Sequence, residues 1–416
     1  MVSYLVLICL FLIPFYIFRF SIFGLPTNIF EISTVITFLI FLGSEIFKFL
    51  RQKKSKIEFS YGYLAAYFLL LFSAISVFFA EDRIRALGIF KGWFLVPAIL
   101  YFRVLNLWKE KKVRQITIPI YISMIIVSIW AGLQKLGIIS TFFYQVGDSG
   151  FSDYLSRFRA FGPFESPNYL AMYLVPAIFI SLPILGYFKR TSDKILLGGL
   201  YILPLHALYA SHSLGGLLAF GFAVISILSF GLTKEYRAKL LNSGTKVTVL
   251  ALALIISAVA FSLIFSSVDK EIYSRNIRVE IYHYSGELIK TRPISGIGLG
   301  EFQDSVEEIS KGNAGFQLYG LSYALHPHNL FLAFWLNLGI LGFLSFLFLL
   351  WSYFRNLARR GGDLLFLASL FAAMIAILIH GIFDTTYFKN DLSVIFWLLL
   401  ALSIIVGEKK DARSTK

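Results

Sequence analysis

One segment of this 416-residue chain joins residues suited to proton transfer with a long apolar run. It begins with His-Pro-His-Asn at 326–329 and continues through Gly339 and Gly342. Imidazole is the side chain best placed to move protons near neutral pH. The two glycines are three residues apart, so they share a helix face and permit close packing. This spacing makes His328 the predicted catalytic base, with Asn329 in support at the start of the helix.

The other histidine of this segment, His326, is predicted to have a supporting role. Pro327 restricts His326 to extended backbone conformations, so the two imidazoles need not point the same way. A structural interpretation also stays open for His328, which could cap the helix start and bond a backbone carbonyl.

Arginines in two other segments predict a site for an anion such as a phosphate. Arg157 and Arg159 precede a Ser-Pro-Asn helix start, and a helix N-terminus favours negative charge. Further on, Arg275, Arg278 and Tyr282 recur at helical spacing and share a face. Arginine suits bidentate phosphate contacts. The alternatives are arginines that anchor a loop to lipid headgroups and a solvated amphipathic helix on the membrane surface.

Further polar residues are predicted to support this site. His380 and Asp384 are four apart near the end of an apolar run at 363–385, on one face, where Asp384 could orient a histidine or balance the arginines. A packing ion pair is the alternative. His212 lies at the end of another apolar run. Lys91 lies inside one, where it could snorkel towards water or contact an anionic ligand.

Other kinds of site are not indicated. The run PISGIGLGEF at 293–302 has no strand before it and no Gly-Lys-Ser/Thr after it, so it predicts a tight turn that lets Phe302 fold back rather than a nucleotide loop. The chain has one cysteine, Cys9, and no His-Glu-x-x-His motif. We therefore predict no metal and no cofactor.

The elements that must position these residues are membrane helices. The sequence is 57% hydrophobic and 15% charged, with a mean hydropathy of +0.75, which is too apolar for a soluble domain of this size. We expect one all-α integral membrane domain over 1–416, with a first span that is retained rather than removed as a signal. Twelve predicted spans lie near 3–18, 29–48, 62–80, 86–104, 116–137, 168–188, 195–210, 214–232, 247–267, 328–352, 363–385 and 391–407.

We attribute the net charge of +14 to the membrane topology of the chain rather than to nucleic-acid binding. Lys and Arg concentrate in one alternate set of loops, which the positive-inside rule assigns to the cytoplasm together with both termini. Two long loops, 138–167 and 268–327, then lie outside the cytoplasm with the candidate residues. The predicted active site is extracytoplasmic.

Four blocks, in this order, resemble the O-antigen ligase and O-antigen polymerase family of membrane glycosyltransferases, which includes pilin oligosaccharyltransferases. The resemblance covers about 155–400. The blocks are RAFGPFESPN, the run from Arg278 through PISGIGLGEF, HNLFLAFWLNLGILG and HGIFDTTYFKND.

The resemblance implies a GT-C-like fold in a bacterial inner membrane. It implies an undecaprenyl-diphosphate-linked glycan donor, an acceptor such as lipid A-core or another glycan or protein, and an inverting, metal-independent transfer. By position, acceptor activation falls on His328 and diphosphate binding on Arg278 and Arg159. The chain departs from the family at Leu214, where an arginine is common; His212, Arg275 or Lys91 could replace it.

Three alternatives stay open. A polymerase of the same family would differ in its acceptor. A transporter or flippase of lipid-linked saccharides would bury charges in mid-span, whereas here they gather at one face. A peptidoglycan polymerase would use an acidic residue of the large loop, such as Asp304, Glu307 or Glu308.

Overall fold

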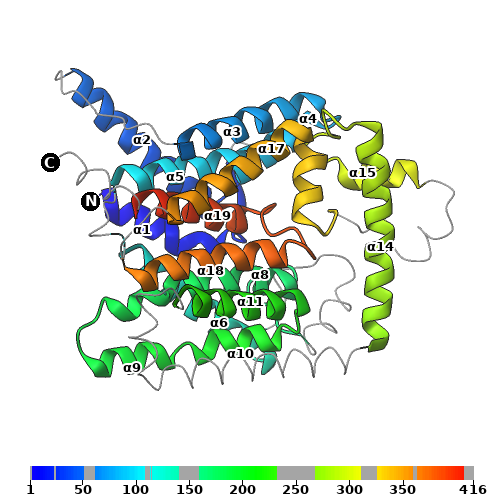
Figure 1. Cartoon of the computed structure of the whole chain (residues 1–416). Helices are drawn as coiled ribbons and strands as arrows, with labels where there is room; N and C mark the ends of the chain where they lie inside the picture. The colour runs from blue at the N-terminus through cyan, green and yellow to red at the C-terminus, as the bar shows by residue number, and fades with distance from the viewer. Residues whose placement is uncertain are drawn as a thin grey trace.

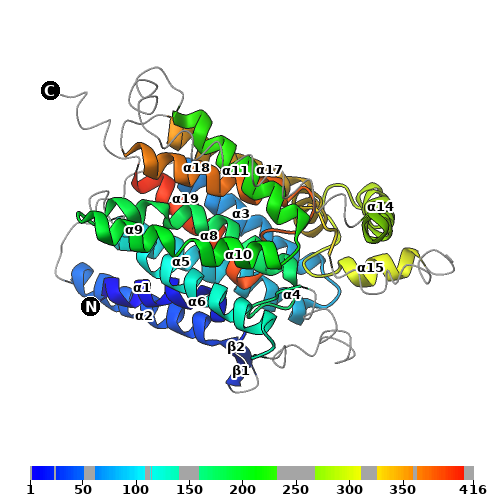
Figure 2. The ribbon, with the colours of Figure 1, turned by 90° about the horizontal axis from the view of Figure 1, so that it is seen from below.

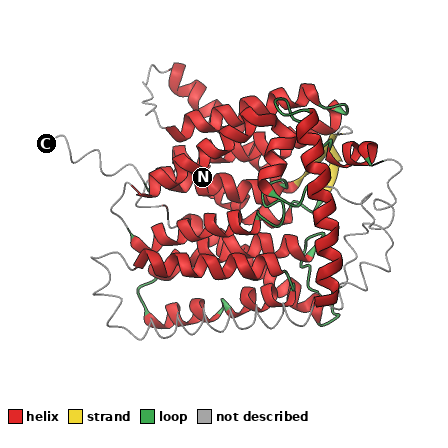
Figure 3. Ribbon diagram, turned by 45° about the vertical axis from the view of Figure 1, so that its right-hand side comes forward, coloured by secondary structure: helices red, strands yellow, loops and turns green. Residues whose placement is uncertain are grey.

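Helices make up most of the described chain. A computed structural model describes residues 2–22, 25–50, 61–107, 113, 115–139, 159–231, 268–310, 326–358 and 363–406. Figure 3 shows these helices and the single small hairpin of β1 (Arg19–Ile22) and β2 (Leu25–Asn28). The predicted span at 247–267 and the candidate residue Arg157 lie outside the described residues.

Most of the helices run along one another as a bundle, in which the pairs α11 with α18, α3 with α17, and α5 with α19 are neighbours (Figure 1). Its helices are α1 (Val2–Leu12), α2 (Ile29–Leu50), α3 (Tyr61–Phe79), α4 (Arg83–Phe90), α5 (Val96–Leu107), α6 (Thr117–Lys135), α8 (Pro167–Ser181), α9 (Thr191–Gly199), α10 (Ile202–Ala210), α11 (Leu214–Gly231), α17 (Leu330–Ala358), α18 (Leu364–His380) and α19 (Asn390–Ile405).

Among the described residues, five helical segments are long and apolar enough to cross a membrane: 62–79, 83–107, 117–135, 167–186 and 330–358. Shorter apolar helices accompany them, including α11, α18 and α19. This agrees with the predicted all-α membrane protein, while the count of twelve spans and the GT-C-like arrangement stay predictions.

One predicted span has a different form. The segment 195–210 is not a continuous helix, because α9 ends at Gly199 and α10 begins at Ile202. Two consecutive glycines at 198–199 favour this break, since glycine has a low helix propensity. None of the residues of α9 is buried.

The bundle core forms around two helices. α8 and α19 are buried along nearly their whole length. A helix that is apolar on all sides belongs in the interior of a large protein or membrane bundle. Both helices begin at the end of the bundle where the candidate residues lie, so a rigid centre supports the site.

A helix of different character crosses that end of the bundle. α14 (Val268–Thr291) lies across the bundle helices, with α15 (Phe302–Ile309) beside it (Figures 1 and 2). Phe302 is buried, as the glycine-rich turn predicted. Residues of α14, α15 and the turn between them form a second small core with α17: Ile281, Tyr284, Leu288, Ile297, Phe302, Val306 and Leu336.

A glycine in α17 lets this outer layer dock on the bundle. Gly339 interrupts α17 with φ 68° and ψ −176°, and the turn at 294–297 fits against that kink. Ile297 N donates to Leu336 O at 2.7 Å, and Ile340 N donates to Ile294 O at 3.1 Å. A Cβ on Gly339 would clash with Ile294 O. The motif glycine thus serves contact with the turn rather than with a second helix.

Candidate active site: a histidine pair on a buried aspartate

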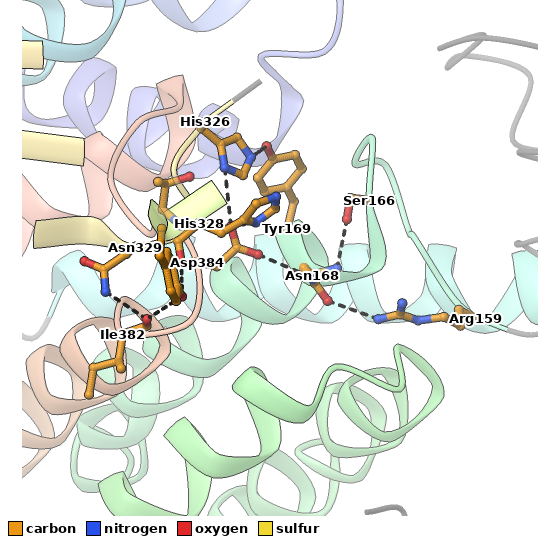
Figure 4. Close-up of polar contacts among 11 residues, drawn as sticks. Arg159, Ser166, Asn168, Tyr169, His326, His328, Asn329, Ile382 and Asp384 are labelled. Atoms are coloured by element: carbon orange, nitrogen blue, oxygen red, sulfur yellow. Dashed lines mark hydrogen bonds and ion pairs between the residues drawn. The ribbon is translucent and has the colours of Figure 1, made fainter. Parts of the chain in front are cut away.

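Asp384 is the centre of the candidate site, and its carboxylate joins its own turn to the segment 326–328 and to the start of α8 (Figure 4). The side chain is 4% exposed. Oδ1 lies 3.3 Å from His328 Nδ1 and accepts a hydrogen bond from its neighbour Thr385 N at 2.9 Å. Oδ2 accepts a hydrogen bond from Asn168 Nδ2 at 3.2 Å.

The helix end that carries Asp384 differs from the prediction. α18 ends at His380, so the two residues do not share a helix face. Asp384 lies in a turn after the helix, where its N–H donates to His380 O at 3.0 Å. The turn projects the carboxylate towards the start of α17.

The backbone at His328 aims its imidazole at this carboxylate. Its φ is 45°, and in the described part of the chain only His212 is another non-glycine residue with positive φ. A left-handed non-glycine residue is costly and is concentrated at functional sites. Tyr282 of α14 donates to the carbonyl of His328 at 3.1 Å and so holds this strained residue. The prediction for Tyr282 as a supporting residue fits this contact.

Asn329 is the cap of α17. Its Oδ1 accepts hydrogen bonds from Phe331 N at 2.9 Å and Leu332 N at 3.0 Å, and its Nδ2 donates to Ile382 O at 3.0 Å. Because Asn329 satisfies the helix start, His328 does not have that task. The imidazole of His328, 28% exposed, is left for contact with Asp384 and with a ligand.

His326 turns towards the same carboxylate. The two imidazole centroids are 4.3 Å apart, and His326 Nδ1 lies 3.8 Å from Asp384 Oδ1. On the other side of the ring, Nε2 pairs with the hydroxyl of Tyr169 at 3.0 Å. Pro327 left the relative direction of the rings open, and the structure makes them converge.

Charge at the centre is set by burial and by these contacts. Burial opposes ionisation of Asp384, but the neighbouring His328, His326 and His380 outweigh it and hold the pKa of Asp384 well below its usual range. Burial, and then repulsion by His328, lowers the pKa of His326 to about 3, with partial compensation from Asp384. At neutral pH the site therefore holds a carboxylate beside a neutral His326.

A chain of polar contacts leads from Asp384 to an arginine. Asn168 Oδ1 accepts a hydrogen bond from Arg159 Nη2 at 3.0 Å. Arg159 also donates to Ser211 O at 2.8 Å and His212 O at 3.2 Å. Burial and then the like charge of Arg278 lower the pKa of Arg159 to about 10, so it stays charged at neutral pH. The two predicted donor-binding arginines are thus near one another.

The other predicted residues have separate surroundings. Lys91 forms an ion pair with Glu31 at 2.9 Å. His380 is buried against Gly215, and His212 is exposed with its carbonyl bonded to Arg159. Arg275 lies in α14, and nothing is described of its side chain.

Two contact residues were missed by the sequence analysis. Asn168 and Tyr169 begin α8, and both touch the Asp384 cluster. Asn168 stands inside the block RAFGPFESPN, so its presence in that block was the available signal. Nothing local to the sequence links Tyr169 to a histidine 157 residues away.

Comparisons with known proteins give the same family as the motifs. The family model described as O-antigen ligase matches residues 199–347. A protein of Rickettsia typhi named as a polysaccharide ligase is 24% identical over 85% of this chain and 86% of its own length. A protein of the same name from Rickettsia prowazekii is 30% identical over 38% of this chain and 39% of its own length. These matches confirm the predicted resemblance to the O-antigen ligase family.

Proposed function

We propose that this chain, an integral membrane protein assigned to the O-antigen ligase family, transfers a glycan from an undecaprenyl-diphosphate carrier to an acceptor hydroxyl. The reaction would take place outside the cytoplasm, at the end of the bundle covered by α14. The contact between His328 and Asp384 carries this proposal, because it supplies an oriented proton acceptor.

The tautomer of His328 follows from its partner. An ionised carboxylate can only accept hydrogen bonds, so His328 Nδ1 carries the proton that faces Asp384. Nε2 then keeps its lone pair and accepts the proton of the attacking hydroxyl. The hydroxyl oxygen forms a bond to the anomeric carbon as the bond from that carbon to the diphosphate oxygen breaks. The imidazolium that forms is stabilised by Asp384.

The leaving diphosphate requires positive charge rather than a proton. Arg278 suits this role, because its guanidinium makes no hydrogen bond or ion pair within the described residues and it lies near enough to Arg159 for their like charges to repel. Arg159 is held by Asn168 and by two carbonyls. We therefore assign the direct phosphate contact to Arg278 and a supporting electrostatic role to Arg159. Cleavage of the bond between the glycan and the diphosphate drives the transfer, so this mechanism needs neither metal nor nucleotide.

A polymerase that adds the same donor to a growing glycan is the second candidate, since the chemistry is identical and only the acceptor differs. Purified protein offered the carrier-linked donor with either lipid A-core or a carrier-linked glycan distinguishes the two. A peptidoglycan polymerase would need an acidic residue such as Asp304 for catalysis. Asp304 instead forms an ion pair with Arg85, with 2.6 Å between Oδ2 and Nη2, which argues against this role. If neither acceptor received glycan from the donor, the proposed transfer would be wrong.

A further inference from the structure

The histidine pair and Asp384 also form the face of a metal site. One nitrogen from His326, one from His328 and a carboxylate oxygen of Asp384 all lie within 4.8 Å of one another. His328 Nδ1 lies 3.3 Å from Asp384 Oδ1, and His326 Nδ1 lies 3.8 Å from the same oxygen. Ligand atoms about 2.0–2.1 Å from a tetrahedral zinc ion are roughly 3.3 Å apart. Small side-chain movements would therefore close the three atoms around one ion.

The orientation of His326 supports this interpretation. Its Nδ1 is buried without a hydrogen-bond partner among the described residues, and it faces the carboxylate of Asp384. A buried nitrogen that makes no hydrogen bond costs free energy. A cation between the two side chains would satisfy both the nitrogen and the carboxylate.

Two of the three ligands, His326 and Asp384, also have the outer partner that metal sites usually provide. Tyr169 contacts the far nitrogen of His326 at 3.0 Å, and Asn168 donates to the far oxygen of Asp384 at 3.2 Å. Such contacts fix ring orientation and ligand basicity. Two imidazoles and one carboxylate match the ligand types of zinc sites that keep a fourth position for water or substrate.

We propose that His326, His328 and Asp384 bind a Zn²⁺ ion, and that this ion inhibits glycan transfer. The inhibitory consequence rests on the proposed function. A metal on Nδ1 of neutral His328 uses the lone pair there, so the ring proton must be on Nε2. Nε2 then becomes a donor and no longer accepts the proton of the acceptor hydroxyl. The ion and the proton-accepting tautomer exclude each other.

Cobalt binding tests the site without any transfer assay. Full-length protein in detergent, stripped with EDTA, is titrated with Co²⁺ while its visible absorption is recorded. We expect one Co²⁺ per chain with the intense band of a low-coordinate ion. His326→Ala and Asp384→Asn should bind at least tenfold more weakly, and Tyr169→Phe roughly 10–100-fold more weakly. His206→Ala, at an exposed histidine of α10, should bind as the parent does.

A second variant covers the case in which His326→Ala fails to fold. His326→Cys supplies a thiolate ligand, so it should bind Co²⁺ and add a sulfur-to-metal charge-transfer band. Absence of a cobalt band in the parent, or equal affinity in His326→Ala and the parent, would overturn the proposed site.

Transfer assays then test the consequence of binding. Added Zn²⁺ should inhibit the parent and EDTA should restore it, while His326→Ala should need at least tenfold more Zn²⁺ for the same fractional inhibition of its own rate. Transfer unaffected by saturating Zn²⁺ would overturn the tautomer argument. Transfer by EDTA-stripped protein only after Zn²⁺ is added would support the metal site. It would contradict both the proposed inhibition and metal-independent transfer. If no condition gave transfer, the proposed function would fail while the cobalt result still decided the metal site.

Discussion

His328 and Asp384 are 56 residues apart in the chain and meet with 3.3 Å between Nδ1 and Oδ1. His328 lies just before α17, and Asp384 lies just after α18. The left-handed backbone of His328 and the turn at Asp384 bring imidazole and carboxylate together. This pair combines a proton acceptor with the group that orients it.

Replacement of Asp384 by Asn should slow transfer without removing the base. The amide has nearly the same shape but no charge, so it neither fixes the Nδ1–H tautomer of His328 nor stabilises the imidazolium. We expect kcat to fall roughly 100-fold, within the range of general-base effects, and KM for the donor to change little. Initial rates over a donor series measure this. A fall in donor affinity with unchanged kcat would instead place Asp384 in donor binding.

Arg278→Ala should weaken donor binding while the fold is retained. Within the described residues the guanidinium of Arg278 makes no hydrogen bond, so its loss should leave the fold intact. A hydrogen bond from this charged group to the donor would contribute about 1.5–3 kcal/mol, or roughly 10–150-fold in affinity. KM for the lipid-linked donor and Tm of the protein in detergent are the two measurements.

Arg159→Ala is the matched variant for that experiment. Arg159 bonds Asn168, Ser211 and His212, so its loss should lower Tm as well as activity. Equal effects of the two substitutions on Tm would contradict the division of roles between Arg278 and Arg159.

The sequence predicted the parts of this site that local patterns determine. The spacing of His328, Asn329 and Gly339 indicated a helix start and a close approach, and both are present. The spacing did not show that Gly339 kinks α17 to receive the turn at 294–297, because that contact depends on a distant segment. The position of Asp384 on a turn was missed because its four-residue spacing from His380 also fits a helix.

Two further features could not come from sequence patterns. The positive φ of His328 turns its imidazole beside His326, although Pro327 left that arrangement open. Lys91 has the charge expected of a phosphate ligand, but Glu31, 60 residues earlier in the chain, is its ion-pair partner. Its proposed contact with donor stays a prediction.

Acid should destabilise the protein through His326. Its pKa is about 3 when folded and about 6.5 in an unfolded chain, so the unfolded state binds more protons between these values. Stability from neutral His326 is therefore fully present above about pH 6.5 and is lost as pH falls towards 3. Tm measured between pH 7.5 and 4.5 should fall less steeply for His326→Gln than for the parent. Parallel Tm curves would contradict this assignment.

Gly339→Ala should destabilise the docking of α14. The added methyl group would clash with Ile294 O, and φ of 68° is strained for alanine. We expect a clear loss of Tm and of transfer activity. Gly221→Ala is the matched control, because a Cβ there meets nothing within 4 Å in α11. Since alanine favours helix over glycine, that variant should keep or slightly raise Tm. Equal Tm values for the two variants would contradict the proposed structural role of Gly339.

The central claim is that His328 accepts the proton of the attacking hydroxyl. Purified His328→Ala and His206→Ala should be compared with the parent for transfer from an undecaprenyl-diphosphate-linked glycan, with donor binding measured on the same samples. We expect His328→Ala to bind donor like the parent but to transfer roughly 10²–10⁴-fold more slowly, and His206→Ala to be unaffected. Parental transfer rates in His328→Ala would contradict this claim.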